Sequence, residues 1–222
     1  MSGEMLSQAA TLIGLTVAVV GLTARWRETR RRAAPVDRAP AKGDPARGVR
    51  YAFTVGMAPW TKESTRLHAL AYLRGVGFHL AIFAGAAVLL GRPVWPMLPP
   101  WLRAAAAGAL GLGALLGAAG SVMRLREPHL RALSTVDDHV SIWLVTASLA
   151  MTGLALWEAQ FIVPMYVAAA LMLAYIPLGK IRHCLYFFLA KGYFGRFGGR
   201  RGVLPPRGPS GQPASFVREG AR

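Results

Sequence analysis

The chain alternates between long apolar runs and basic stretches that contain proline. The apolar runs cover about residues 5–23, 73–90, 101–123, 139–157 and 161–178. A helix rises about 1.5 Å per residue, so a run of about 18 apolar residues is long enough to cross a hydrocarbon core about 30 Å thick. The pattern therefore predicts an all-α integral membrane protein built as a five-transmembrane-helix bundle.

The segments between these runs predict how the chain is organised. Residues 1–23 form the first transmembrane helix, and the basic cluster at residues 25–32 follows that helix instead of preceding it. This order is opposite to that of a cleaved secretory signal, so we expect an uncleaved helix with the N-terminus outside. We expect a basic cytoplasmic loop at 24–66, a four-helix membrane bundle at 67–191 and an extended basic cytoplasmic tail at 192–222. Residues 183–189 are expected to continue the fifth helix.

Charge gives the predicted orientation. The sequence has 26 Lys and Arg against 10 Asp and Glu, and its formal net charge is +16. Only Arg92 and Arg103 fall in segments that this topology places outside, and an excess of basic residues marks cytoplasmic loops. The C-terminus is therefore expected in the cytoplasm, and the charge requires no nucleic-acid partner. The bias toward Ala, Gly, Arg and Pro suggests a prokaryote, so we expect a multi-pass protein of the cytoplasmic (inner) membrane.

Two histidines lie where the predicted topology brings two helices to the same depth. His79 is inside the second span, and His183 is at the inner end of the fifth. Ionisable residues inside spans are costly and often functional, and a pair on facing helices is what bis-histidine haem b needs. A lone histidine in a membrane can instead form a hydrogen bond between helices. The spacing alone favours neither interpretation.

Other polar residues cluster near the same predicted membrane face. Haem propionates could meet basic side chains there, and the candidates are Arg74, Lys180 and Arg182. For His68 and His139 we favour contact with propionates or a quinone, and a second haem held by these two histidines is the alternative. The neighbouring Asp137 and Asp138 could accept protons from a quinol or cap the fourth helix, and capping is favoured.

The histidine segments resemble a known family. The Phe78-His79 segment and the motif Ile176-Pro177-Leu178-x-Lys180-x-x-His183, together with five predicted helices, resemble the membrane cytochrome b (gamma) subunit of respiratory nitrate reductase. The same segments also resemble the relatives of this subunit in sulfur-metabolism and heterodisulfide-reductase-like complexes. It implies haem b with His79 and His183 as axial ligands of the iron, within the bundle at 67–191. The ligand positions of the family's outer haem hold Leu89 and Met165 here, which favours one haem and leaves two as the alternative.

The resemblance implies an electron-transfer subunit that is not catalytic alone. Such a subunit relays electrons between the quinone pool and a cytoplasmic iron–sulfur partner. The chain has a single cysteine, Cys184, so it carries no iron–sulfur cluster of its own. The basic loop 24–66 and the tail 192–222 are the expected docking surfaces, and membrane lipid is a further expected contact. The alternative is a haem-free structural membrane anchor or assembly subunit. A transporter is disfavoured because the sequence shows no inverted repeat.

Overall fold

The computed structural model describes residues 2–32, 36–61 and 67–205, and these residues form helices and no strand. The chain divides into two compact units. The first unit comprises Met1–Thr29 and Leu70–Arg182, and the second comprises Arg30–Ala69 and His183–Arg222. The prediction of an all-helical protein is therefore confirmed for the described residues.

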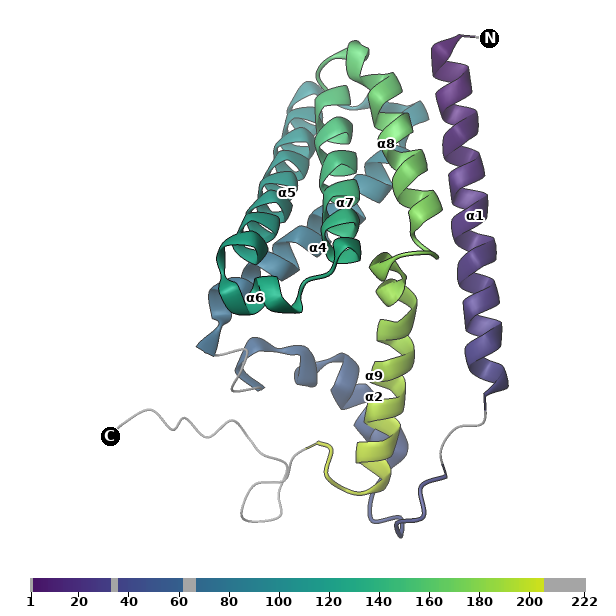
Figure 1. Cartoon of the computed structure of the whole chain (residues 1–222), viewed down its shortest axis with the longest axis vertical. Helices are drawn as coiled ribbons and strands as arrows, with labels where there is room; N and C mark the ends of the chain where they lie inside the picture. Colours follow the sequence, from purple (N-terminus) through teal and green to yellow (C-terminus); the bar gives the residue numbers. More distant parts are fainter. Residues whose placement is uncertain (1, 33–35, 62–66, 206–222) are drawn as a thin grey trace. The chain divides into compact units, whose positions relative to one another are not determined.

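Long helices build the first unit, and Figure 1 shows α7 between α5 and α8. The short helix α6 (Pro128–Leu133) connects α5 to α7. The long helices are α1 (Gly3–Arg31), α4 (Ala69–Leu90), α5 (Pro100–Arg126), α7 (Val136–Ala155) and α8 (Ile162–Tyr175). Short 3-10 helices follow α4 at Arg92–Met97, precede α8 at Ala159–Phe161 and end the unit at Lys180–Arg182.

Three of these helices, α1, α4 and α5, are long and apolar enough to cross a membrane. A fourth span exists if Ala159–Tyr175 and Lys180–Arg200 are counted together as one bent span. Helix α7 is not among these helices. Asp137, Asp138 and His139 lie near its start, and it buries several Ser and Thr side chains. The chain is thus a membrane protein with three to four such spans in its described part. Five spans with the N-terminus outside remain a prediction.

The predicted fifth helix is interrupted, which corrects the expectation that it continues through residues 183–189. Helix α8 ends at Tyr175, and a separate helix, α9 (His183–Arg200), begins after the turn at 176–179. Pro177 has no N–H to donate to the carbonyl four residues earlier, so it weakens the helix there. The N–H groups of Leu178 and Gly179 instead donate to the Tyr175 carbonyl, each at 3.0 Å.

Glycine contacts along α5 organise the core of the first unit. A Cβ at Gly113 would collide with Ala81 of α4, and a Cβ at Gly117 would collide with Phe78 of α4 and Thr146 of α7. Small residues let helix backbones approach closely, which matters in a membrane because lipid is as apolar as the side chains. Helix α5 therefore packs against α4 and α7 at once.

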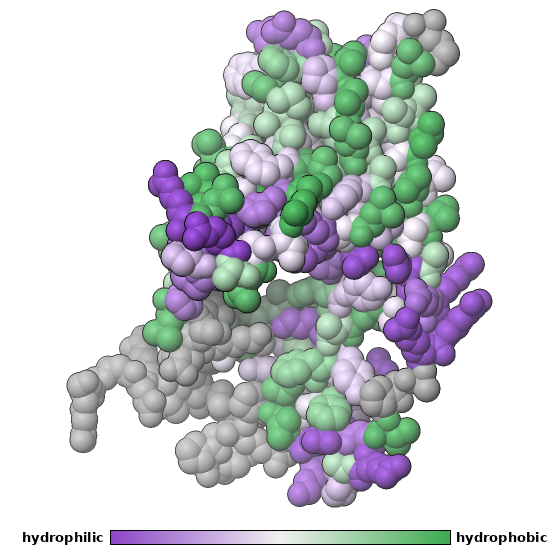
Figure 2. Space-filling model, in the orientation of Figure 1, coloured by the Kyte–Doolittle hydropathy of each residue, from purple (hydrophilic) through white to green (hydrophobic). Residues whose placement is uncertain are grey.

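Helix α1 packs along α8 with one face and leaves the other exposed. Gly14 approaches the Ala170 backbone of α8, and the Thr11 hydroxyl donates to the Tyr166 carbonyl at 2.8 Å. Leu12 and Val20 lie on exposed positions of α1. In Figure 2, hydrophobic side chains line the visible face of α1 and a hydrophilic cluster lies at its C-terminal end. This is the surface expected of a helix in contact with lipid.

The second unit is an antiparallel pair of helices, α2 (Pro45–Phe53) and α9. The Asp44 carboxylate caps α2 by accepting from the Ala46 N–H at 2.8 Å. Gly48 of α2 lies almost in backbone contact with Gly195 and Gly199 of α9. Figure 1 labels both helices.

Two predicted boundaries change in the second unit. The expectation of an extended tail is wrong for residues 192–200, because the glycines of this segment pack against α2 as part of helix α9. Residues 206–222 lie outside the described residues. The predicted loop 24–66 is also partly helical, since α1 continues to Arg31 and α2 lies within it.

A substitution at Gly113 tests the α5 contacts. Gly113→Ala should lower the stability of the detergent-solubilised protein by about 1–3 kcal/mol, because an added methyl group would overpack the contact with Ala81. Gly108→Ala is the matched control, since no atom lies within 4 Å of a Cβ there and α5 is helical at both positions. Gly108→Ala should leave stability unchanged or raise it by up to about 1 kcal/mol. Thermal unfolding followed by circular dichroism measures the stability of both variants. Equal changes in stability would contradict the close packing of Gly113 against Ala81.

Candidate functional site

His79 lies on the exposed face of α4 and not in the core of the first unit. Its Nδ1 is 2.7 Å from the Gly75 carbonyl oxygen, one turn earlier in the helix. A carbonyl can only accept a hydrogen bond, so in the neutral ring Nδ1 carries the proton and Nε2 carries the lone pair. This is the tautomer that an axial ligand of a haem iron needs at Nε2. No atom lies within 4 Å of a Cβ built on Gly75, so the backbone beside the ring is open.

His183 is the first residue of α9 and is exposed. It belongs to the second unit, whereas His79 belongs to the first. Joint ligation of one iron by these two histidines stays a prediction. The other predicted pair is divided in the same way, because exposed His68 precedes α4 in the second unit and half-buried His139 lies in the first turns of α7.

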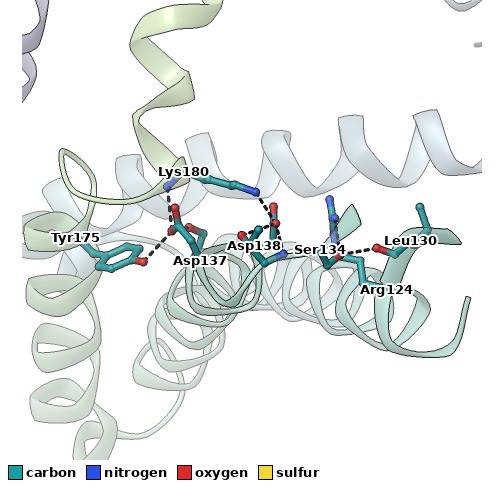
Figure 3. A network of polar contacts seen from close by, with 9 residues as sticks. Arg124, Leu130, Ser134, Asp137, Asp138, Tyr175 and Lys180 are labelled. Atoms are coloured by element: carbon teal, nitrogen blue, oxygen red, sulfur yellow. Dashed lines mark hydrogen bonds and ion pairs between the residues drawn. The ribbon is translucent and has the colours of Figure 1, made fainter. Parts of the chain in front are cut away.

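The structure brings Asp137 together with residues of the segment that follows α7 in the chain. Its Oδ1 accepts from the Tyr175 hydroxyl at 2.7 Å, from the Lys180 backbone N–H at 3.1 Å and from the Ser141 hydroxyl at 3.1 Å. Figure 3 shows the Tyr175 hydroxyl directed toward this carboxylate, whereas the Lys180 side chain extends to Asp138. Gly179 is required here, because a Cβ at this position would meet the Tyr175 ring and lie 2.7 Å from Asp137 Oδ1. The carboxylate thus holds the chain where it leaves α8.

Thr135 is the N-cap of α7 and Asp138 completes a capping box with it, so the favoured capping interpretation is confirmed for Asp138 but not for Asp137. The Asp138 Oδ2 accepts from the Thr135 N–H at 2.8 Å and from the Thr135 hydroxyl at 2.9 Å. The same oxygen accepts from the Lys180 ammonium. Burial would raise the pKa of the Asp138 carboxyl, but the hydrogen bonds from Lys180 and Thr135 outweigh it and lower the pKa to about 2.

The Asp137 carboxyl also has a lowered pKa. The hydrogen bond from Tyr175 is the largest cause, and those from the Lys180 backbone and Ser141 add to it against the opposing effect of burial. Both carboxylates are therefore held in the charged form at neutral pH. Charged, multiply bonded carboxylates are poor proton acceptors, so the geometry favours a structural role for this pair over proton uptake from a quinol.

The three basic residues expected near haem propionates all have partners in the first unit. Lys180 binds Asp138, Arg182 donates to the Leu178 carbonyl at 3.2 Å, and Arg74 contacts the Met123 sulfur at 2.6 Å. A propionate would have to compete with Asp138 for Lys180. The propionate role of these residues stays a prediction.

Some polar residues of the first unit were missed by sequence reasoning. Ser141 and Tyr175 join the Asp137 network, and only the four-residue spacing from Asp137 to Ser141 signals this in the sequence. The hydroxyls of Ser121 on α5 and Thr146 on α7 are buried and have no hydrogen-bond partner among the described residues. Within the same ranges, no three His, Cys, Asp or Glu side chains converge on a point where they could hold a metal ion.

No protein-family model, curated protein or solved structure matches the chain. The resemblance of the histidine motifs to the cytochrome b subunits therefore stays a prediction.

Replacing Asp137 tests the network at the α8 turn. Asp137→Ala removes three hydrogen bonds to a carboxylate and should destabilise the purified protein by about 2–4 kcal/mol, since each bond to a charged group contributes about 1.5–3 kcal/mol and the effects overlap. Tyr175→Phe should cost less because it removes one bond. The control Glu158→Ala changes an exposed carboxylate beyond the other end of α7 and should have almost no effect. Equal losses for Asp137→Ala and Glu158→Ala in thermal unfolding would show that the network does not stabilise the turn.

The lowered pKa of Asp138 makes the stability of the first unit depend on pH. The carboxyl has a pKa of about 2 in the fold and a reference value of 3.8, so its contribution to stability is present above about pH 4 and is lost as the pH falls toward 2. Asp138→Asn should reduce stability at pH 6 and flatten the fall in unfolding temperature between pH 4 and pH 2. Thermal unfolding at half-unit pH steps measures this, and an unchanged slope in the variant would assign the acid sensitivity to other groups.

Proposed function

We propose that this chain is a haem b membrane anchor subunit that relays electrons between the quinone pool and a cytoplasmic iron–sulfur partner of a respiratory-type redox complex. The observation that carries the proposal is the hydrogen bond between His79 Nδ1 and the Gly75 carbonyl, because in the neutral ring it puts the proton on Nδ1 and the lone pair on Nε2, which is the tautomer of a histidine that binds iron through Nε2. A haem b, when bound, supplies a one-electron centre within the membrane, and an anchor subunit without a cluster of its own needs such a centre to pass electrons on.

The residues of α4 fit a haem on the side that carries His79. The imidazole is exposed, and apart from the backbone of α4 and the two adjacent residues no atom of the described residues lies within 4 Å of a Cβ built on Gly75. His183 is the proposed second axial ligand, and Arg74, Lys180 and Arg182 are the proposed propionate contacts. We favour one haem, because Leu89 and Met165 stand at the positions where the resembled family ligates its outer haem. His68 and His139 are proposed to contact a propionate or a quinone.

The proposed topology places the N-terminus outside and the partner on the cytoplasmic side of a prokaryotic inner membrane. Its support is the distribution of Lys and Arg, of which only Arg92 and Arg103 fall outside the proposed cytoplasmic segments. The partner would supply the iron–sulfur clusters and the catalytic site. The basic segments 24–66 and 192–222 are the proposed docking surfaces for this partner.

A haem-free structural anchor is the second candidate. The Asp137 and Asp138 network and the α5 glycine contacts hold the first unit together without a cofactor. Such a subunit would tether or assemble the same kind of complex without carrying electrons.

Spectroscopy of purified protein with its co-purifying subunits tests the proposal. The reduced-minus-oxidised spectrum should show a b-type α band, with about one haem per chain by the pyridine haemochrome assay. His79→Ala and His183→Ala should each abolish the low-spin signal while circular dichroism stays unchanged. His129→Ala is the control, because His129 is exposed and pairs with Glu127 on the short segment around α6.

Different results distinguish the alternatives. A complex with all its subunits and no haem would leave the structural anchor as the function. A ratio near two haems per chain would favour His68 and His139 as further ligands. A low-spin signal that survives in both His79→Ala and His183→Ala would show that other residues bind the iron.

A further inference from the structure

The helix pair of the second unit presents a strongly basic surface on a closely packed support. Gly48 packs against Gly195 and Gly199, so the two helices stay nearly in backbone contact. The only acidic residues among the described residues of this unit are Asp37 and Asp44. The basic residues are Arg30, Arg31, Arg32, Arg38, Lys42, Arg47, Arg50, Lys191, Arg196, Arg200 and Arg201.

Two of these arginines, Arg200 and Arg201, bind other residues of the second unit. Arg201 donates to both carboxylate oxygens of Asp37, at 2.9 and 3.2 Å, and its guanidinium lies 4.0 Å from the centre of the Phe197 ring. Arg200 donates to the Ala39 carbonyl at 3.2 Å and lies 3.8 Å from Asp37. The pKa of the Asp37 carboxyl is lowered, chiefly by its hydrogen bond to Arg201. These two arginines fasten residues 37–39 to the end of α9.

A second group has no such partner. Arg47 and Arg50 lie three residues apart on α2 and therefore on one side of that helix, and Arg196 lies on α9. All three are exposed, and none has a hydrogen bond or ion pair from its side chain within the part of the chain that the structure describes. Both carboxylates among the described residues of the unit are occupied elsewhere, since Asp37 binds Arg201 and Asp44 caps α2. The charge of these three arginines is therefore directed outward.

Large apolar side chains accompany these charges. Phe188 and Phe194 of α9 are 61% and 52% exposed, and Trp60 is 58% exposed. Phe188 also stacks on Phe53 of α2, with ring centres 6.2 Å apart, so its position is fixed by the helix pair. Exposed aromatic rings and arginines in the same helical unit are typical of segments that lie at the level of lipid headgroups.

Chain connectivity selects lipid as the occupant of this surface. The segment Arg30–Ala69 follows directly on α1 and leads directly into α4, and both helices are long and apolar enough to cross a membrane. A unit tethered at both ends of this segment to membrane-spanning helices meets headgroups at a high effective concentration. A guanidinium binds a phosphate through two parallel hydrogen bonds, which suits the headgroup of an anionic phospholipid.

We propose that Arg47, Arg50 and Arg196 bind the phosphate groups of anionic phospholipids, with the exposed aromatic side chains of the same unit at the headgroup level. The paired residues Arg200 and Arg201 do not take part, because Asp37 and the Ala39 carbonyl hold them. The proposal is independent of haem binding, which concerns α4 and the start of α9. It assigns these three arginines of the basic segments 24–66 and 192–222 to lipid and leaves the other residues of those segments to the protein partner.

The test is a lipid titration of the full-length, delipidated protein in a neutral detergent at low salt. Native mass spectrometry measures the dissociation constants for phosphatidylglycerol and phosphatidylcholine. The wild-type protein should prefer phosphatidylglycerol. A basic residue near an anionic surface contributes about 1 kcal/mol, or about fivefold in affinity, so Arg47→Gln/Arg50→Gln should weaken phosphatidylglycerol binding by about 25-fold.

Arg200→Gln/Arg201→Gln is the matched control, because it removes the same charge from the same unit at arginines that already have partners. It should change phosphatidylglycerol affinity by less than about threefold, with circular dichroism confirming that the helices remain. The double variant Arg47→Lys/Arg50→Lys keeps the charge but loses the paired hydrogen bonds of the guanidinium, so its affinity should lie between those of the wild-type protein and Arg47→Gln/Arg50→Gln.

Three results would overturn the proposal. The first is equal affinity of the wild-type protein for the two lipids. The second is an equal loss in both glutamine double variants, which would indicate a general effect of net charge. The third is unchanged lipid affinity in Arg47→Gln/Arg50→Gln with loss of a co-purifying acidic subunit, which would make this surface a protein-docking site. The haem spectrum should be unchanged in all these variants, so failure of lipid binding and failure of the haem proposal are separate outcomes.

Discussion

Close approach of helix backbones at glycine is the contact on which both units depend. In the first unit, Gly113 and Gly117 let α5 lie against α4 and α7 at once, and in the second unit Gly48 meets Gly195 and Gly199. Helices in a membrane gain little from burying apolar side chains against each other, because lipid offers the same apolar surroundings. Dispersion contacts between closely spaced backbones are then a main source of attraction, and they are available only where side chains are small.

Two carboxylates fix the end of α8 and the start of α7. Pro177 interrupts the hydrogen bonding that would extend α8, and Asp137 binds the Tyr175 hydroxyl and the Lys180 N–H on the two sides of the resulting turn. Asp138 completes the capping box of α7 and binds the Lys180 side chain. The two neighbouring acids thus join the start of one helix to the end of another. Carboxylates have the same two roles in the second unit, where Asp37 binds Arg201 and Asp44 caps α2.

The proposed haem ligation and the proposed lipid contact use different residues. The first depends on His79, whose hydrogen bond to the Gly75 carbonyl orients the ring and sets its tautomer. The second depends on Arg47, Arg50 and Arg196, whose side chains have no partner among the described residues. Arginines with the same chemistry at positions 200 and 201 are engaged internally. A residue type therefore does not by itself indicate a binding surface, and the presence or absence of an internal partner is the more informative observation.

Local patterns in the sequence are enough to predict the features that involve residues a few positions apart. Apolar runs predicted α1, α4 and α5 as helices fit to span a membrane, and Asp138 near the start of α7 was predicted as a cap, because both depend on residues a few positions apart. Only the tertiary structure decided the end of α8 at Tyr175, the helical state of residues 192–200 and the binding of Asp137 to residues about 40 positions away. These features depend on contacts between distant segments. A glycine-rich segment such as 192–200 is a poor helix former alone, and the backbone of α2 packed against it makes its helical state favourable.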